Sequence, residues 1–472
     1  MPKQNITRRG FLKTAGLLAL ATGMPSWAVR ADSAVDRLAA GLAADKMPQL
    51  KTNSDFDIIV AGGGPAGCAA ATAAARRGFK TLLIESTGLL GGLGTSGMVP
   101  AWCPFSDGEK VIYKGIAWEV FESAKKGVPF EPVDKTDWVA INPEYLTAVY
   151  DRLVSESGVQ VLFFSKVAGV EKSGDDTVES IIVANKNGLT AYKAKVFVDA
   201  TGDGDICTWA GADYMKGDSE GNLQKSTLCF SVANVNMEAY GNGPELHSGH
   251  NPDSPSVRAS RTGRYPLLDT HCCHNPIGPG VVGFNANHID IKDTTDPAEL
   301  SAAMIKGRQI AEQHLEMLKE YRPDAFSDAF IVKTAVLPGI RDSRRIKGDY
   351  IFTADDWYAR RTFDDEIGRN CYFIDIHKAG HTDIHYGRGE SHGIPYRCLT
   401  PTGLSNVLTA GRCISTDEES YGSLRVMPNC LVTGQAAGVA ATLAANSGRT
   451  DIHGIDTDDL RRILRQDGAY FL

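Results

Sequence analysis

The segment Asp57-Ile58-Ile59-Val60-Ala61-Gly62-Gly63-Gly64-Pro65-Ala66-Gly67 determines the fold class of this 472-residue chain. Its apolar residues predict a short strand, its glycines a tight turn, and the alanine-rich residues that follow a helix that stops at Gly78. Residues 80–85 predict a second strand, which ends at Glu85. Strand, glycine turn, helix and strand in this order form the β-α-β unit of a dinucleotide-binding domain.

Each part of the glycine turn has a role in binding a dinucleotide. In the pattern G-x-G-x-x-G, the first glycine permits the tight turn, the second lets the backbone approach the pyrophosphate, and the third lets helix and strand pack closely. The helix N-terminus offers unpaired N–H groups to the phosphates. The acidic residue at the end of the second strand accepts hydrogen bonds from ribose hydroxyls. The predicted contacts are Gly62, Gly64, Pro65, Ala66, Gly67 and Glu85.

Residues 278–283 repeat the glycine spacing but are not predicted to bind a second nucleotide. No apolar strand is expected before them, and residues 284–292 look extended rather than helical. The chain therefore lacks a second dinucleotide fold for NAD(P)H, which argues against the two-nucleotide plan of disulfide reductases. We expect that nicotinamide is not a direct partner.

Later glycine-rich segments indicate FAD rather than NAD. Residues 91–97 are small enough to pass close to a flat ring, and residues 200–205 form another glycine turn after a strand. A helix that begins near Pro428 would direct its N-terminus at the pyrimidine edge of a flavin and stabilise negative charge on the reduced ring. The further predicted FAD contacts are Gly91, Gly92, Thr95, Ser96, Val167, Ala200, Thr201, Gly202, Asp203, Gly411, Arg412, Gly434, Gln435 and Ala436.

Together these segments resemble the FAD-dependent oxidoreductase family, whose members carry G-G-G-x-A-G, A-T-G-D-G-D, G-x-R-x-S-R-R-I-x-G-D-Y and a C-terminal block ending in G-Q-A-A-G. Besides the first two motifs, the matching residues are 339–350, 394–397, 410–415 and 425–438. The resemblance runs from about Asp55 to Ala445 and implies the glutathione-reductase-like FAD fold. It also implies a flavin and redox chemistry, and it implies no particular substrate.

The N-terminus predicts export in the folded state. Thr7-Arg8-Arg9-Gly10-Phe11-Leu12-Lys13 matches a twin-arginine signal, and a short apolar run, 14–24, follows. Cleavage is expected after Ala31, with Ala28 as an alternative. We therefore expect a periplasmic or otherwise exported protein. Because the chain has 57 acidic against 49 basic residues, its negative charge argues against binding nucleic acid. No long uncharged apolar stretch predicts a stable membrane anchor.

The predicted fold class is α/β, a Rossmann-like FAD-binding domain of a β-α-β unit and a β-meander, with an inserted mixed α/β substrate lobe. The meander is expected between Val159 and Val198, where short alternating segments are separated by Gly-Asp and Asn-Gly turns. The expected order is a signal peptide, a loosely ordered leader, the first part of the FAD-binding domain, the substrate lobe and the return segment of the FAD-binding domain, at residues 1–31, 32–54, 55–225, 226–390 and 391–472.

Arginines and histidines are the candidates for chemistry on the substrate. Arg341, Arg344 and Arg345 would clamp a carboxylate or stabilise reduced flavin, or form salt bridges that hold the lobe to the FAD-binding domain. His377, His381, His385 and His392 lie close together in the chain, and metal binding, proton transfer and a purely structural role are all open.

Among these histidines, His392 is the first choice for proton transfer because it directly precedes the Ile394–Arg397 block expected near the ring. His377, Tyr421 and Arg425 are further catalytic candidates. His271 and His274 flank the pair Cys272-Cys273 without the spacing of a standard metal site, and no metal ligands are assigned.

The predicted function is hydride transfer between flavin and a small organic substrate, with oxidation of a hydroxyl- or amine-bearing compound preferred. Electrons would pass to an external carrier such as a quinone, a cytochrome or O2. One alternative is reduction of a C=C bond with electrons from such a carrier. The other is a non-catalytic binding protein stabilised by flavin. The substrate, the electron partner and the oligomeric state stay open.

Overall fold

The computed structural model describes residues 50–247, 251–377, 384–448 and 450–472. Residues Thr52–Leu472 belong to one compact unit. The predicted signal peptide and residues 32–49 of the predicted leader lie outside the described residues. The end of that leader, expected to be loosely ordered, forms strand β1 (Lys51–Asn53). The predicted boundaries between FAD-binding domain and lobe remain predictions.

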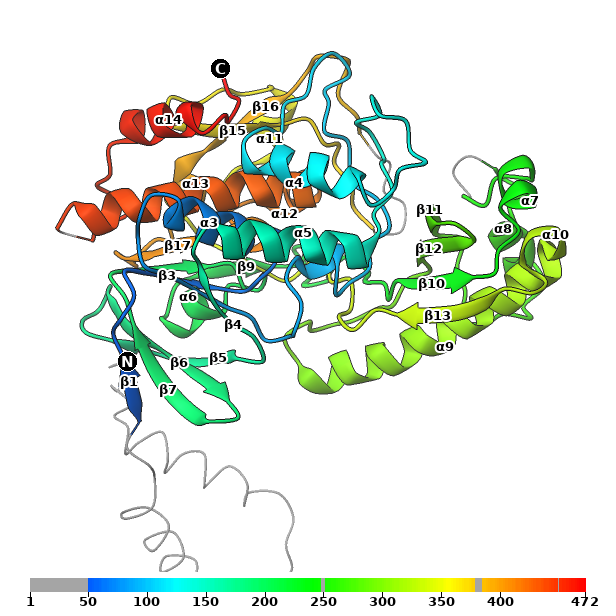
Figure 1. The fold of residues 1–472 in the computed structure, drawn as a ribbon, viewed down its shortest axis with the longest axis horizontal. Helices are drawn as coiled ribbons and strands as arrows, with labels where there is room; N and C mark the ends of the chain where they lie inside the picture. Colours follow the sequence, from blue (N-terminus) through cyan, green and yellow to red (C-terminus); the bar gives the residue numbers. More distant parts are fainter. Residues whose placement is uncertain (1–49, 248–250, 378–383, 449) are drawn as a thin grey trace, which may run out of the picture. The chain divides into compact units, whose positions relative to one another are not determined.

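A parallel sheet of five strands forms the centre of the unit, in the order β17-β8-β2-β3-β4 (Figure 1). Every neighbouring pair in this sheet is parallel, so all five strands end at the same edge. The first two strands predicted from the sequence are β2 and β3. The bounds are Ile58–Ala61 for β2, Thr81–Ile84 for β3, Gln160–Leu162 for β4, Val196–Asp199 for β8 and Val407–Thr409 for β17.

Alternate residues of these strands face two different layers. Ile58, Val60 and Leu83 belong to a core shared with helices α3, α4, α5 and α13, whereas Ile59 and Leu82 belong to a core shared with the meander. The period of two explains why the strands are apolar throughout, since both faces of the sheet are covered. The bounds are Pro65–Ala75 for α3, Ile116–Lys125 for α4, Pro143–Glu156 for α5 and Met427–Asn446 for α13; the predicted meander is β5 (Lys166–Lys172), β6 (Val178–Asn185) and β7 (Gly188–Lys193).

The helices α3 and α13 cross at very short range, and glycines make this contact possible. A Cβ atom added to Gly434 would lie 2.2 Å from the carbonyl oxygen of Ala66, and one added to Gly438 would lie 2.2 Å from that of Ala70. No larger residue fits at either position. The Gly-Gln-Ala-Ala-Gly motif therefore fixes the packing of α13 on the helix that follows the glycine turn.

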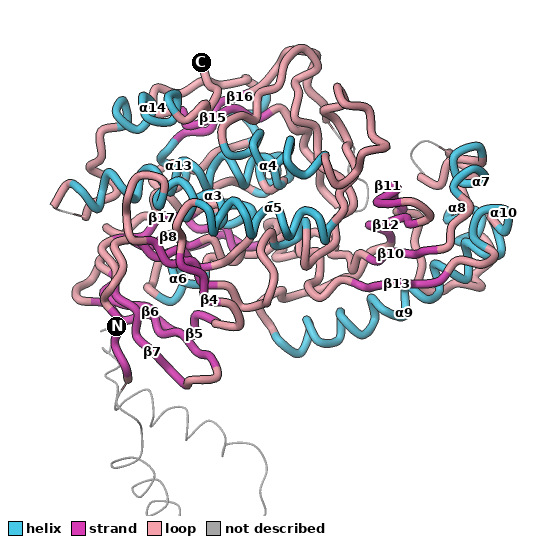
Figure 2. The backbone as a smooth tube through the Cα atoms, in the orientation of Figure 1, coloured by secondary structure: helices cyan, strands magenta, loops and turns pink. Residues whose placement is uncertain are grey.

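A four-stranded antiparallel sheet in the order β11-β12-β10-β13 lies within the predicted substrate lobe, and the long helix α9 packs against β13 (Figure 2). Its core contains Phe230, Phe284 and Phe326. The repeated glycine spacing at 278–283 is the turn of the β11–β12 hairpin, so it opens no helix. The expectation that no strand precedes it is wrong, because β11 does. The bounds are Phe230–Ala233 for β10, Cys272–Gly278 for β11, Val281–Ala286 for β12, Phe330–Thr334 for β13 and Pro297–Tyr321 for α9.

Short elements connect these layers. Strand β14 (Arg344–Ile346) pairs with β9 (Tyr214–Lys216), and β15 (Glu366–Asn370) pairs with β16 (His392–Pro395). The remaining helices are α6 (Asp205–Trp209), α7 (Met237–Asn242), α8 (Pro255–Ser260), α10 (Pro323–Phe326), α11 (Ala354–Tyr358), α12 (Glu418–Leu424), α14 (Thr457–Gln466), η2 (Gly92–Gly94), η3 (Tyr396–Cys398) and η4 (Gly411–Cys413). Within the described ranges, every helix is too short or too polar to cross a lipid bilayer.

Candidate cofactor and substrate site

The carboxyl edge of the parallel sheet brings together the segments predicted to bind the cofactor. Backbone hydrogen bonds join Gly62 N to the carbonyl of Ile84, Ala200 N to that of Ala61, and Ala410 N to that of Asp199. The turns after β2, β3, β8 and β17 therefore lie side by side. Ligands of open α/β sheets bind at this edge.

The glycine turn has the geometry that the sequence pattern requires. Gly62 has φ of 96°, and a Cβ atom there would lie 2.3 Å from the carbonyl oxygen of Ala200. A Cβ atom on Gly67 would lie 1.8 Å from the carbonyl oxygen of Gly62. Beside Gly64, in contrast, no atom lies within 4 Å of an added Cβ, so this side of the turn is open. The open side lies at the start of α3, where the N–H groups attract phosphate.

Glu85 holds the glycine turn against the end of β3. Its buried carboxylate accepts hydrogen bonds of 2.7 Å from the backbone N–H of Gly63 and of 2.7 Å from that of Thr87. A carboxylate offers about four lone pairs, so it can still accept from a ribose hydroxyl. The predicted ribose contact thus also has a structural role.

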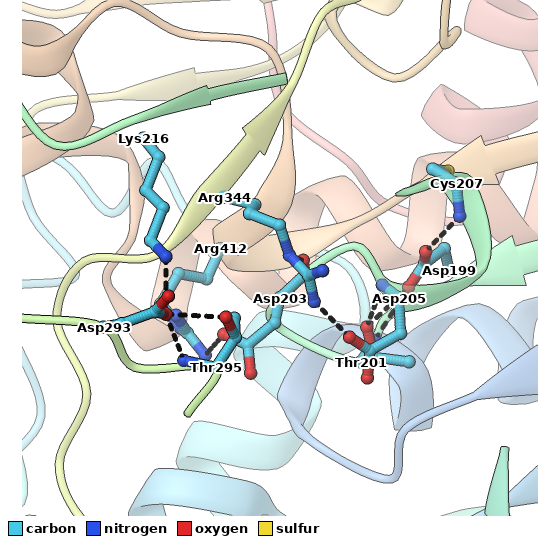
Figure 3. A network of polar contacts seen from close by, with 10 residues as sticks. All are labelled: Asp199, Thr201, Asp203, Asp205, Cys207, Lys216, Asp293, Thr295, Arg344 and Arg412. Atoms are coloured by element: carbon cyan, nitrogen blue, oxygen red, sulfur yellow. Dashed lines mark hydrogen bonds and ion pairs between the residues drawn. The ribbon is translucent and has the colours of Figure 1, made fainter. Parts of the chain in front are cut away.

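A second turn, 199–207, is built around the fully buried carboxylate of Asp199 (Figure 3). One oxygen accepts from the hydroxyl of Thr201 at 2.7 Å, and the other accepts from the N–H of Cys207 at 3.0 Å. Arg412 forms an ion pair of 2.8 Å with Asp203 across this turn. The predicted contacts Ala200, Thr201, Gly202 and Asp203 are all part of it.

Arg344 also binds this turn. Its Nε donates to the carbonyl of Asp203 at 2.7 Å, and its guanidinium forms an ion pair with Asp205 (Figure 3). The side chain of Arg345, the next residue of the strand, points to the opposite face and forms an ion pair of 3.0 Å with Asp342. For these two arginines the contacts favour the salt-bridge role that the sequence left open.

The residues around the edge fit the predicted FAD. Ser96 Oγ is buried and has no hydrogen-bond partner among the residues that the structure describes. Buried polar atoms of this kind normally have a partner, and a bound ligand would supply one. The helix α13 begins at Met427, with proline in its first turn as predicted, beside the turn that holds Gly411.

The other predicted cofactor contacts are placed less uniformly. Gly91 and Gly92 have left-handed φ values of 99° and 53°, and an added Cβ on Gly92 would lie 3.0 Å from Gly64 Cα. Gln435 accepts a hydrogen bond of 2.9 Å from the N–H of Ile116 on the α4 side. The hydroxyl of Thr95 donates a hydrogen bond of 2.6 Å to the carbonyl of Leu90. Val167 lies in the core beneath the meander. Gly434 and Ala436 pack within the helical layer.

Arg341 lies away from the other two arginines of its motif and beside Arg425. It is 7% exposed, and it donates to the carbonyl of Lys225 at 2.8 Å and to Asn285 Oδ1 at 3.4 Å. Burial and the charge of Arg425 lower the pKa of Arg341 to about 10. Arg425 has Asp375 as an ion-pair partner at 3.2 Å, whereas no described carboxylate lies within ion-pair distance of Arg341.

His377 joins the same cluster. Its Nε2 is 3.1 Å from Asp375 Oδ1, and its Nδ1 is 3.0 Å from His288 Nε2. Burial and the nearby Arg341 lower the pKa of His377 to about 4. The structure thus brings together three of the predicted catalytic residues, Arg341, Arg425 and His377. It adds Asp375 and His288, which no local sequence pattern marked.

His392 lies elsewhere, in the pairing of β16 with β15. It is fully buried, its Nε2 is 2.9 Å from Asn370 Nδ2, and its Nδ1 is 2.9 Å from the carbonyl of Gly393. Its ring packs on Phe352 with the centroids 4.6 Å apart. Because both nitrogens are bonded inside the protein, these contacts favour a structural role over the predicted proton transfer.

Tyr421, on α12, lies against Arg345, whose guanidinium is 5.1 Å from the ring centroid. Among the other two histidines of that group, His385 stacks on Phe373, and His381 is outside the described residues.

We expect His392→Gln to remove one titrating group from acid unfolding. Burial lowers the pKa of His392 from its ordinary 6.5 to about 3. Its neutral form therefore stabilises the fold fully above pH 6.5, and that stability is lost as the pH falls from 6.5 towards 3. In this window the wild type should lose about 1.4 kcal/mol more per pH unit than the variant. Urea unfolding at several pH values measures the difference.

His453→Gln is the control of opposite sign. Burial by itself would lower the pKa of His453, but hydrogen bonds to Asp349 and to the carbonyl of Leu404 raise it above its ordinary value. Its contribution is therefore present below pH 6.5 and lost as the pH rises above that value. If His392→Gln keeps the wild-type slope between pH 3 and 6.5, then the imidazole is charged in the fold and this placement is wrong.

A hollow of about 660 Å³ lies at the other end of α3, away from the glycine turn. Its lining includes Arg76 and Arg77, which pair with Glu119 and Asp467 respectively. Both arginines thus have a carboxylate partner within the protein. It gives no indication of a ligand, and the candidate site remains the carboxyl edge of the sheet.

Comparison with known proteins relates this geometry to flavoenzymes. A family model described as FAD dependent oxidoreductase matches residues 57–464. Glutathione reductase of Schizosaccharomyces pombe is 28% identical over 161 residues, which are 31% of this chain and 31% of that protein. Pseudooxynicotine dehydrogenase of a Pseudomonas species is 35% identical over 114 residues, 24% of this chain and 21% of that protein. The chain thus matches less than a third of the length of either relative.

Among solved structures, a geranylgeranyl bacteriochlorophyll reductase-like protein of Thermoplasma acidophilum is similar over 90% of this chain and 93% of its own. The sequence identity is 14% and the TM-score is 0.45. The structure of a flavin-dependent brominase is similar over 87% of this chain and 83% of its own, with 13% identity and a TM-score of 0.43.

Proposed function

Since this chain belongs to the FAD dependent oxidoreductase family, whose model matches residues 57–464, we propose that it oxidises a small carboxylate-bearing compound. The predicted FAD cofactor, the predicted enzyme class and the predicted α/β fold are confirmed by the family match and the parallel sheet. The substrate class and the direction of the reaction are the proposal.

The observation that carries the proposal is the buried guanidinium of Arg341. Leaving a charge buried without a counter-charge costs several kcal/mol, and Arg341 has no ion-pair partner among the residues described. Arg425 adds a second positive charge beside Arg341, and Asp375 compensates one of these two charges. One positive charge is left over, and a substrate carboxylate would neutralise it through charge-assisted hydrogen bonds.

The roles of the chain's residues follow from this arrangement. Arg341 and Arg425 bind and orient the substrate carboxylate, and Asp375 holds Arg425 in place. The turns at Gly62–Gly67 and Asp199–Cys207, together with the start of α13, hold the cofactor. When bound, FAD supplies the two-electron acceptor for the substrate. The unpaired N–H groups of α13 favour negative charge near the helix start.

Anaerobic mixing of the FAD-loaded protein with paired compounds tests the proposal. Hydroxy acids and amino acids are compared with their uncharged amides and esters, and loss of oxidised flavin absorbance is followed. We expect reduction by at least one acid, and at least 100-fold slower reduction by its amide, a difference of about 3 kcal/mol. Reduction by neutral compounds alone would refute the carboxylate site.

Reduction of a C=C bond next to a carboxylate is the second candidate, and the same unpaired Arg341 favours it. Such a substrate would also need an anion site, which Arg341 and Arg425 would provide. Reoxidation of chemically reduced protein by unsaturated acids, without oxygen, distinguishes the two directions. An external electron carrier is needed in either case.

Export by the twin-arginine route is part of the proposal, because Arg8-Arg9 and the apolar run after them match that signal. We expect Arg8→Lys with Arg9→Lys to keep the protein in the cytosol with its FAD. Fractionation of cells that produce each form measures this, with Lys3→Arg as a control that should not change export. Undiminished export of the double variant would contradict the prediction.

A further inference from the structure

Three imidazoles from distant parts of the chain meet beside Arg341. His271 directly precedes β11, His288 follows β12, and His377 belongs to the segment after β15. One ring nitrogen from each lies within 4.8 Å of the other two. The rings of His271 and His288 stack with centroids 4.5 Å apart, and His377 lies edge-on to both.

Carboxylates fix the orientation of two of these rings. His288 Nδ1 is 2.6 Å from Asp269 Oδ2, and His377 Nε2 is 3.1 Å from Asp375 Oδ1. Each carboxylate accepts a hydrogen bond, so each of these nitrogens carries the proton of its neutral ring. When both rings are neutral, the nitrogens on the opposite sides, His288 Nε2 and His377 Nδ1, each present a lone pair.

These two nitrogens lie 3.0 Å apart, a distance at which either a shared proton or a metal ion beside them joins the two rings. The third nitrogen, His271 Nε2, is buried and has no hydrogen-bond partner among the described residues. His271 therefore has a ring nitrogen available to a ligand.

The geometry agrees with a metal ion. With metal–nitrogen bonds of about 2.0–2.1 Å, two ligands of a tetrahedral site are about 3.3 Å apart. The observed 3.0 Å is near this value, and rotation of His271 would bring in the third ligand. A carboxylate on the outer nitrogen is the arrangement that orients histidine ligands in metal sites. Asp269 and Asp375 also place two negative charges beside the proposed metal position.

We propose that His271, His288 and His377 bind one divalent transition-metal ion, with Asp269 and Asp375 as positioning residues. Three imidazoles favour zinc, cobalt, nickel or copper over magnesium and calcium. Three protein ligands leave one position open for water or a ligand atom. The side chains of His288 and His377 are each 16% exposed, so solvent reaches this position. The site stands on its own geometry and does not depend on the proposed substrate.

Cobalt titration of the FAD-loaded protein, made without a histidine tag and freed of metal with a chelator, tests the site. Spectra are recorded after reduction of the flavin or as differences, so that cobalt bands in the visible range are resolved. We expect one equivalent of Co²⁺ to bind and to be displaced by Zn²⁺. Calorimetry with Zn²⁺ gives the stoichiometry independently.

Variants assign the metal to these residues. His288→Gln and His271→Gln should each weaken binding at least 100-fold, and Asp269→Asn should weaken it by about 10- to 100-fold. His274→Gln is the matched control, because His274 lies on β11 and bonds Glu245 but has no nitrogen in the cluster. FAD content and the thermal midpoint report whether each variant is folded.

The wild-type protein alone can overturn the proposal, whatever the variants do. Absence of a cobalt signal and of zinc binding at one equivalent would show that the three rings form only a hydrogen-bonded cluster. Equal binding by the wild type and by a variant that combines His271→Gln, His288→Gln and His377→Gln would place the metal elsewhere and would also overturn it. Since neither readout depends on a substrate or on the rate at which a substrate reduces the flavin, failure of the carboxylate proposal leaves this result unchanged.

Discussion

Gly64→Val is expected to fold like the wild type and to lose its FAD. Gly64 has φ of −69° and ψ of −178°, an extended conformation that valine adopts readily, and no atom lies within 4 Å of an added Cβ. The branched side chain would instead fill the open side of the turn, where the pyrophosphate must approach the backbone. We expect FAD to bind at least 100-fold more weakly, a loss of about 3 kcal/mol. Flavin content after gel filtration and the thermal midpoint measure the two effects separately.

Two other glycines serve as controls for this experiment. Gly67→Val should not fold, because its Cβ would lie 1.8 Å from the backbone oxygen of Gly62. Gly174→Val, in an exposed turn, should change neither stability nor FAD content. A folded Gly64→Val protein with one FAD per chain would show that the cofactor does not contact this turn.

The nucleotide-binding part of the fold could be predicted because its signals are local in sequence. The strand, the turn and the helix at 57–77 are contiguous. Each glycine of the turn is required by the local backbone geometry, which the neighbouring residues determine. Parallel pairing of β2 with β3 then follows from the short crossover through α3. The meander was predictable for the same reason, since its turns directly join the strands that pair.

The substrate side was less predictable because its contacts are between distant residues. Arg341, Arg344 and Arg345 are almost adjacent in the chain, yet Arg344 and Arg345 alternate on strand β14 and bind different partners. Only Arg341, before that strand, reaches the group around Asp375. The histidine cluster joins residues 271, 288 and 377, and no spacing in the sequence indicates that they meet.

His392 illustrates a different limit of reasoning from the sequence. Its place before the Ile394–Arg397 block made it the first choice for proton transfer, but proximity in sequence says nothing about which way a side chain points. In the strand pair β15–β16 its ring is directed into the core, where Asn370 and the carbonyl of Gly393 satisfy it. A buried histidine with both nitrogens bonded is the commoner case in proteins, and the structure gives His392 these contacts.

Arg341→Met is expected to abolish productive substrate binding without lowering the stability of the fold. Replacing a buried charge that has no partner by an apolar side chain of similar length removes its desolvation cost. The variant loses the hydrogen bond to the carbonyl of Lys225, which costs about 1 kcal/mol. The free energy of unfolding should therefore stay within about 1 kcal/mol of the wild type or rise. With an acidic substrate, kcat/KM should fall at least 100-fold.

Arg345→Met separates this result from a general effect of removing an arginine. Arg345 is as deeply buried as Arg341, but it pairs with Asp342, whose side chain is 1% exposed. Its loss leaves the buried carboxylate of Asp342 without its ion-pair partner, and we expect a loss of stability of about 3–5 kcal/mol. A structural role for Arg341 would make the two variants alike in urea unfolding. If Arg341→Met is destabilised as strongly as Arg345→Met and still uses acidic substrates, the guanidinium has an internal partner and the anion site must be sought elsewhere on the edge of the sheet.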